Sequence, residues 1–316
     1  MLMPGSLILH HYDFSNYSEK VRLVLGLKSL EWNSVEIPAT LPKPYYTPLT
    51  GGYRRAPALQ IGSDVFCDTN LIIDELERRF PQPTIYPGTG ASAQRAFISA
   101  LERWTDSTLT RNAINYISCA HPKASRFTPE FLADRAALLG KPEPGLLHRE
   151  ASANKNLSQL RPQLDWIINI LDDGRNYMCG ENMSLADCLV YHPLWVMDQL
   201  AEGPTEVIPQ PVREWMNRVN DTGHGIPKAM TARAALVAAS KSSPGTPRPS
   251  VPLVGDPKPG STVSIAPLDY GRSNPSAGTL VSIDSRQMTI QHTHEDIGAV
   301  HVHFPRLGYS IRPATG

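Results

Sequence analysis

The sequence predicts an α/β domain, an all-helical domain and a small all-β module, in that order along the chain. Strand and helix patterns alternate over residues 1–88, and amphipathic helical segments fill residues 89–240. A proline-rich linker over 241–260 then precedes short alternating strands over 261–316. A chain of 316 residues is long enough for two or three such units.

Charge and cysteine content narrow the class of protein. Lys and Arg together number 30, and Asp and Glu together also number 30, so the net charge is zero. The overall charge therefore does not favour nucleic acid or an anionic membrane as a partner. No apolar run is long enough to span a membrane, and the N-terminus lacks the pattern of a signal peptide. The 4 cysteines show no CxxC spacing, which argues against a disulfide framework or a cysteine-based zinc site. We therefore expect a cytoplasmic protein.

The first strand and helix place a hydroxyl where an anion could bind. Leu7–Leu9 form a short apolar run typical of a buried strand, and residues 17–28 follow with helical periodicity. The turn between them, Asp13–Asn16, is rich in residue types that cap helices. Ser15 thus lies at a helix start, where backbone N–H groups and the helix dipole favour an anion such as a thiolate.

The remaining elements of residues 1–88 complete a βαβ–ββα order, which is that of a thioredoxin-like domain. A proline-rich loop over 38–48 separates the second strand from the third. The predicted elements are a strand at Trp32–Ile37, a turn and strand within Gly51–Ile61, a strand at Val65–Cys67 and a helix at Asn70–Phe80.

Residues 89–240 show helical patterns and no strand pattern. Ser184 and Asp187 precede an apolar run with the spacing of a capping box, so Asp187 is expected to serve folding and not catalysis. The predicted helices cover Ala91–Ile117 and residues 129–140, 147–172, 184–201, 209–220 and 227–240.

Three ordered segments resemble the glutathione transferase family. They are Ser15-Asn-Tyr-Ser-Glu-Lys-Val-Arg22 at the first helix start, Asp68-Thr69 at the start of the helix predicted over Asn70–Phe80, and the capping box at Ser184. The resemblance covers about residues 5–200. It implies a thioredoxin-like domain, a helical domain and glutathione as co-substrate or cofactor. It also raises the expectation of a homodimer, which the additional β module leaves open.

The resemblance also assigns a tripeptide site. Asp68 and Thr69 would hold the γ-glutamyl end, although either residue could simply cap the helix. Pro57 would be a cis proline, and Ala56 before it would pair its backbone with the cysteinyl unit. Arg54 and Arg55 would meet the glycyl carboxylate because a guanidinium fork suits a carboxylate; the alternative is a solvated surface pair.

Ser15 is the first candidate for activating the thiol. Its hydroxyl would donate a hydrogen bond to the glutathione thiolate and so favour ionisation. The alternative is that Ser15 only caps the helix. Tyr12 is a rival candidate, because some classes of the family use a tyrosine near the end of the first strand, and Tyr17 and Ser18 are fallbacks.

The reaction class follows from the resemblance, and the second substrate does not. We expect transfer of glutathione to a small electrophile, with a glutathione-dependent isomerase as one alternative and a non-catalytic docking protein as another. Core packing is the better explanation for any single residue of the first long helix, but five of them could line the electrophile's pocket: Trp104, Thr108, Arg111, Asn112 and Asn115. Arg111 and Asn112 are the more suggestive, because polar groups that face a cleft could orient a substrate.

The last segment contains two histidine pairs, His292/His294 and His301/His303. On two antiparallel strands each pair would project from one face, and four imidazoles on a common face could hold zinc. Histidines are also acceptable on a half-exposed sheet. We therefore expect no metal, and a module that resembles a small SH3-like barrel and packs on the enzyme body or a partner.

Overall fold

The computed structural model describes residues 5–88, 92–121, 124–140, 149–271 and 274–314. Its N-terminal part has the predicted thioredoxin-like order. A short helix, α2, lies in the loop that was expected to be irregular. The elements are β1 (Ile8–His11), α1 (Asn16–Leu27), β2 (Glu31–Glu36), α2 (Thr47–Thr50), β3 (Ala58–Ile61), β4 (Asp64–Cys67) and α3 (Thr69–Arg79).

The helical part follows the predicted segments closely, with one interruption. The expected helix over Ala91–Ile117 is divided by a π-helical segment, η1, which shifts the register of the residues after it. Ala91 and residues 147–148 lie outside the described residues. The helices are α4 (Ser92–Trp104), η1 (Thr105–Leu109), α5 (Thr110–Ala120), α6 (Pro129–Leu139), α7 (Arg149–Leu171), α8 (Leu185–Ala201) and α9 (Gln210–Asn220).

The capping box at the start of α8 has the folding role that was expected. The Asp187 carboxylate is fully buried and accepts hydrogen bonds from the Ser184 N–H at 2.9 Å and the Met178 N–H at 2.8 Å. The Trp215 indole N–H donates to it from α9 at 3.0 Å. Asp187 therefore ties three segments of the helical domain together.

The expected helix over 227–240 is wrong in its first turn. Residues Ile226–Ala229 form a strand, β5, which pairs in parallel with β2 at the edge of the sheet. The helix that follows, α10 (Ala232–Ser240), begins after Thr231, whose side chain accepts from the Ala234 N–H at 3.2 Å. This exposed strand has no polar and apolar alternation, so its sequence gives no strand signal.

The strand-rich C-terminal module (residues 261–316) joins the same sheet. Its last strand returns to pair with its first, as expected of a small barrel-like unit, while β9 pairs in parallel with β4. The resulting ten-stranded order is β10-β6-β7-β8-β9-β4-β3-β1-β2-β5. The module's strands are β6 (Thr262–Pro267), β7 (Ser276–Ile283), β8 (Gln287–His294), β9 (Gly298–Pro305) and β10 (Tyr309–Pro313).

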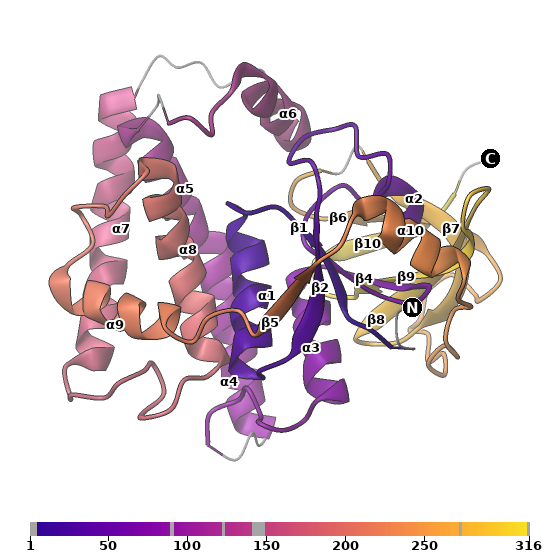
Figure 1. Ribbon diagram of the computed structural model, residues 1–316, viewed down its shortest axis with the longest axis horizontal. Coiled ribbons are helices and arrows are strands. Elements are labelled where there is room, and N and C mark those ends of the chain that lie inside the picture. The colour runs from indigo at the N-terminus through magenta and orange to yellow at the C-terminus, as the bar shows by residue number, and fades with distance from the viewer. Residues whose placement is uncertain (1–4, 89–91, 122–123, 141–148, 272–273, 315–316) are drawn as a thin grey trace.

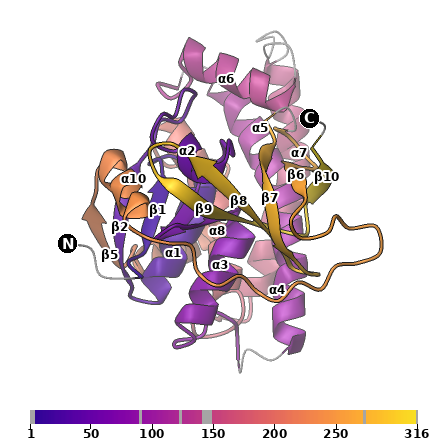
Figure 2. The ribbon, with the colours of Figure 1, turned by 90° about the vertical axis from the view of Figure 1, so that its right-hand side faces the viewer.

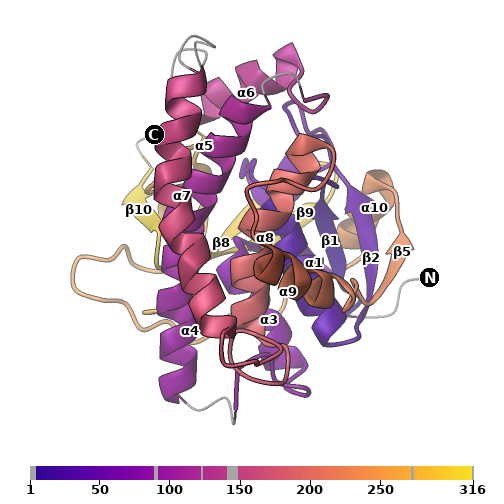
Figure 3. The ribbon, with the colours of Figure 1, turned by 90° about the vertical axis from the view of Figure 1, so that its left-hand side faces the viewer.

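The sheet separates two apolar cores. Alternate residues of β1 point to opposite faces, so Leu9 packs into the core shared with the helical domain and Ile8 into the core shared with the module. Figure 1 shows the helical domain on one side of the N-terminal strands and the module on the other, with α6 above both. Figure 3 shows α5, α7, α8 and α9 forming the helical face.

The proline-rich linker (residues 241–260) has no helix or strand, as predicted, and runs along the module (Figure 2). The Gly245 N–H donates to the Asp64 carboxylate at 2.8 Å, and the Val251 N–H donates to the Ile283 carbonyl at 2.8 Å. Among the described residues, no helix combines the length and apolar character needed to cross a membrane.

Candidate functional site

Strand register brings most of the predicted site residues to one end of the sheet. Ala58, the first residue of β3, lies opposite both His10 near the end of β1 and Cys67 at the end of β4. The loop after β1, the loop before β3 and the loop after β4 are therefore neighbours. These loops carry Ser15, Ala56 and Pro57, and Asp68 with Thr69, respectively.

Ser15 is the N-cap of α1, and its side chain is almost completely buried. Its Oγ accepts a hydrogen bond from the Ser18 N–H at 3.2 Å, so the capping role is observed. Among the described residues, the hydroxyl hydrogen has no acceptor within hydrogen-bond distance. A serine hydroxyl can accept one bond and donate another, so capping and donation to a ligand are compatible.

The two tyrosine rivals are held by other contacts. The Tyr17 hydroxyl donates to the Asp106 carbonyl at 3.4 Å, and burial raises its pKa well above the usual value, so it stays protonated. The Tyr12 ring packs against Phe14, with ring centroids 4.9 Å apart. The Lys43 ammonium lies 5.9 Å from the Tyr12 ring centroid.

Lys43 is a buried cation at the edge of this site. Its ammonium donates to the Arg54 carbonyl at 2.9 Å. Burial, with the nearby charges of Arg135 and Arg54, lowers its pKa to about 7. The Tyr46 hydroxyl donates to the next carbonyl, that of Arg55, at 2.5 Å. Two buried side chains thus hold the backbone carbonyls of the loop before Pro57 in place. The Ala56–Pro57 peptide bond is cis, as predicted.

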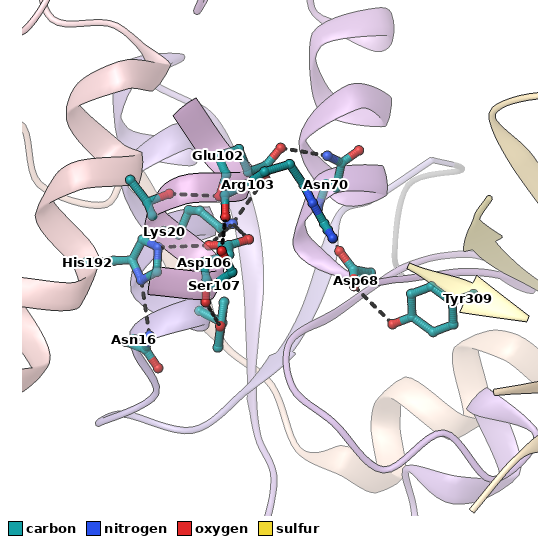
Figure 4. Close-up of polar contacts among 12 residues, drawn as sticks. Asn16, Lys20, Asp68, Asn70, Glu102, Arg103, Asp106, Ser107, His192 and Tyr309 are labelled. Carbon is teal, nitrogen blue, oxygen red and sulfur yellow. Dashed lines mark hydrogen bonds and ion pairs between the residues drawn. The ribbon is translucent and has the colours of Figure 1, made fainter. Parts of the chain in front are cut away.

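Asp68 caps α3 and is also bound by the C-terminal module. One carboxylate oxygen accepts from the Asn70 N–H at 3.1 Å, and the other accepts from the Tyr309 hydroxyl at 2.9 Å. Figure 4 shows Arg103 extending from α4 towards the same carboxylate. Thr69 beside it is buried. No local pattern predicts that a residue of β10 reaches this position.

Both predicted arginines are paired with carboxylates of this chain, so they are not a solvated surface pair. Arg54 is buried and forms an ion pair with Asp134 of α6. Arg55 forms an ion pair with Asp269 at 2.6 Å, and its guanidinium lies 3.8 Å from the ring centroid of Tyr270. Neither partner could be predicted from a local pattern, because both lie far along the chain.

The five residues predicted to line the electrophile's pocket differ in their surroundings. Arg111 and Asn115 are exposed, whereas Asn112 is buried and Thr108 is half-buried. Trp104 packs against Trp166 of α7, with ring centroids 5.7 Å apart. The π-helical segment lies between Trp104 and α5, so Trp104 is rotated relative to Arg111, Asn112 and Asn115 compared with a continuous α-helix.

A buried ionic cluster lies beside the predicted site, and no sequence pattern predicts it. The Lys20 ammonium of α1 is fully buried and donates to Glu102 at 3.1 Å and to Asp106 at 3.0 Å (Figure 4). His192 of α8 contacts Asp106 at 3.3 Å, and the Asn16 amide contacts His192 at 3.1 Å. The cluster joins α1, α4, η1 and α8 at the domain interface.

The cluster contains two carboxylates and one ammonium. Burial lowers the pKa of His192 to about 4, so this histidine is neutral and adds no positive charge. For Asp106, Lys20 and His192 outweigh the effect of burial, and its pKa falls. For Glu102, burial dominates and its pKa rises to about 7. Lys20 belongs to the sequence motif at the start of α1, but its partners could not be predicted from the sequence, because only the fold brings them together.

The histidine pairs of the module lie on opposite faces of the sheet. His292 is opposite Val300 and His294 is opposite Gly298, so both share a face with the buried apolar side of β9. His301 and His303 project from the other face, where His303 contacts Asp64 at 2.8 Å. The alternative of four imidazoles on one face is therefore wrong, and the described residues contain no cluster suited to a metal.

Comparisons with known proteins agree with this architecture. A family model described as the N-terminal domain of glutathione S-transferase matches residues 9–84, and one described as its C-terminal domain matches residues 123–222. The crystal structure of a GST-like protein from Pseudomonas syringae is 31% identical, with a TM-score of 0.76, and the match covers 99% of this chain and 100% of that one. The chain therefore belongs to the glutathione S-transferase family.

Two further relatives match about two thirds of the chain. FtsZ-localized protein A of Caulobacter vibrioides is 26% identical over 200 residues, which cover 62% of this chain and 79% of the relative. A glutathione S-transferase from Rhodospirillum rubrum F11 shares the fold at 19% identity, with a TM-score of 0.52, over 68% of this chain and 87% of that one. The P. syringae structure also matches across the C-terminal module.

Proposed function

We propose that this chain binds glutathione at the end of the sheet where α1 and α3 begin, and that it activates the thiol for attack on a small electrophile. The observation that carries the proposal is Ser15. It is buried at the N-terminus of α1, and its hydroxyl hydrogen has no acceptor among the described residues. A thiolate placed there would receive that hydrogen bond together with the favourable end of the helix dipole.

The proposed chemistry depends on how far the Ser15 hydroxyl and the helix N-terminus lower the pKa of the glutathione thiol. A free thiol has a pKa of about 8.5, so lowering that pKa by about one unit raises the thiolate fraction at neutral pH about eightfold. The thiolate sulfur would supply the electron pair of a new C–S bond, and the leaving group would depart with its own pair. Asp68 and Thr69 would hold the γ-glutamyl end, and the backbone of Ala56 would pair with the cysteinyl unit. The 4 free cysteines suit a reducing, cytoplasmic location.

Three substitutions at Ser15 test whether donation, and not capping, activates the thiol. Ser15→Thr keeps both the cap and the donor. Ser15→Asp keeps the cap, has no donor and adds a negative charge that itself repels a thiolate, whereas Ser15→Ala has neither cap nor donor and adds no charge. We expect the ultraviolet absorbance of bound thiolate to titrate at a low pH in the wild type and Ser15→Thr, and about one pH unit higher or more in the other two. A thiol pKa that is the same in all four proteins would refute the proposed role.

Product analysis separates conjugation from isomerisation. In a transferase, the product retains the glutathione sulfur and glutathione is consumed. In an isomerase, the thiolate adds reversibly to a conjugated double bond, rotation follows, and glutathione is recovered. The buried hydroxyl at a helix start suits both reactions, so net consumption of glutathione is the deciding measurement.

A second candidate function is protein docking. One relative is named for its localisation with FtsZ, and in this chain the guanidinium of Arg55 is already paired. For this candidate we expect the purified protein to co-sediment with FtsZ polymers without glutathione, and Ser15→Ala to co-sediment equally well. Absence of co-sedimentation, combined with glutathione turnover, would leave the transferase proposal alone.

A further inference from the structure

The C-terminal module reaches into the proposed glutathione site through one loop. The segment between β6 and β7 carries Asp269 and Tyr270, which contact Arg55 of the thioredoxin-like domain, 214 positions away in the chain. The Leu268 N–H donates to the Gly308 carbonyl, and the Gly271 N–H donates to the Leu138 carbonyl of α6, each at 2.8 Å. The loop is thus held at both sides of the contact.

The contact satisfies Arg55 in the way that a ligand carboxylate would. Two guanidinium nitrogens face the two Asp269 oxygens, at 2.6 and 3.4 Å. A third contact comes from the Tyr270 carbonyl, which accepts from the same guanidinium, while the Tyr270 ring lies 3.8 Å from its centre. A guanidinium facing two carboxylate oxygens is the standard arrangement for recognising a carboxylate.

The second arginine offers no replacement. Arg54 is buried and is paired with Asp134, whose other oxygen contacts Arg135 at 2.6 Å. Asp134 also accepts from the Leu41 N–H at 3.1 Å, so this pair is built into the packing of α6 against the proline-rich loop. In contrast, the Asp269 side chain is 57% exposed, and solvent can take over its contacts when it is displaced.

We propose that Asp269 is a specificity-determining residue, which competes with the terminal carboxylate of a peptide thiol for Arg55. This inference rests on the proposed function. The wild-type site then binds glutathione and a derivative that lacks the glycyl charge with similar affinity, because neither finds a free guanidinium. Removing the charge of Asp269 frees Arg55, which Tyr270 still holds in place by its ring and carbonyl.

Calorimetric titration with glutathione and with its glycyl monoethyl ester tests this inference. Asp269→Asn should bind glutathione about two- to fivefold more tightly than the wild type, the range of a partly exposed ion pair. Its affinity for the ester should not change. Asp296→Asn is the matched control, because it removes an exposed aspartate of the same module and should alter neither affinity.

A double variant, Arg55→Gln with Asp269→Asn, guards against an indirect effect. It should return the affinity for glutathione to that for the ester, since no guanidinium is left to distinguish them. Thermal unfolding of each variant verifies that the module stays folded.

Each outcome has a distinct meaning. Equal binding of glutathione by Asp269→Asn and the wild type, or an equal change for both ligands, overturns the inference while the proposed function stands. Tighter binding of glutathione by Asp269→Asn, with unchanged binding of the ester, supports the inference. If no protein binds either ligand, the proposed function fails and this inference fails with it.

Discussion

Replacing Glu102 by Gln should stabilise the protein at high pH, although it removes half of an ion pair. Glu102 and Asp106 share the single ammonium of Lys20 in a buried site, and His192 beside them is neutral. One carboxylate is therefore in excess. Burial raises the pKa of Glu102 from 4.5 to about 7, against the smaller opposing effect of Lys20.

The sign and size of the effect follow from proton linkage. Because the pKa is higher in the folded state, Glu102 contributes stability that is fully present below pH 4.5 and is lost as the pH rises through 7. A shift of this size corresponds to roughly 3 kcal/mol at most. Glutamine stays neutral, so the free energy of unfolding of Glu102→Gln relative to wild type should rise by about 2–3 kcal/mol between roughly pH 5 and 8.

Urea unfolding followed by tryptophan fluorescence at these two pH values measures the difference. Glu77→Gln is the matched control, because Glu77 is equally buried and shares the Lys28 ammonium with no second carboxylate among the described residues. The Lys28 Nζ lies 2.6 Å from a Glu77 carboxylate oxygen. That variant should be less stable than the wild type by about 3 kcal/mol at both pH values, since it leaves a buried ammonium without its carboxylate, although two backbone carbonyls still accept from it. A Glu102→Gln difference that does not change with pH would refute the reasoning.

Two further predictions concern packing and the module contact. Gly26→Ala should lower the free energy of unfolding by more than about 2 kcal/mol in a urea titration, because the added Cβ would lie 2.0 Å from the Gly223 carbonyl oxygen. Gly203→Ala is the control and should be close to neutral, because its added Cβ meets nothing within 4 Å. Burial raises the pKa of Asp64, but hydrogen bonds from His303 and a backbone N–H outweigh it and hold the pKa below 3.8. Asp64→Asn should therefore cost about 1–2 kcal/mol at neutral pH, and the difference from wild type should shrink as the pH falls below 3.8; a constant difference would contradict this.

Local signals in the sequence predicted local structure well. Ser15 marks the start of α1, and Asp68 marks the start of α3. The Ser184–Asp187 spacing identifies the start of α8. In each case the signal is a side chain that satisfies backbone N–H groups within the next few residues, so no distant contact is needed to predict it.

Long-range pairing explains what the sequence could not show. The pairing of β4 with β9 joins segments more than 230 positions apart, and no local pattern specifies it. The same pairing geometry brings Tyr309 to Asp68 and Asp269 to Arg55. These contacts are the largest difference between the predicted site and the observed one. They come from the C-terminal module, and the helix and strand patterns do not predict that this module contacts the site.

The most direct test of the central claim is calorimetric titration of the purified protein with glutathione, on the wild type, Asp269→Asn and Asp68→Ala. The account predicts saturable binding by the first two proteins and its loss in Asp68→Ala, which removes the proposed γ-glutamyl contact at the start of α3. Binding that survives in Asp68→Ala would place the tripeptide elsewhere. No saturable binding by either the wild type or Asp269→Asn would contradict the claim that this member of the family uses glutathione.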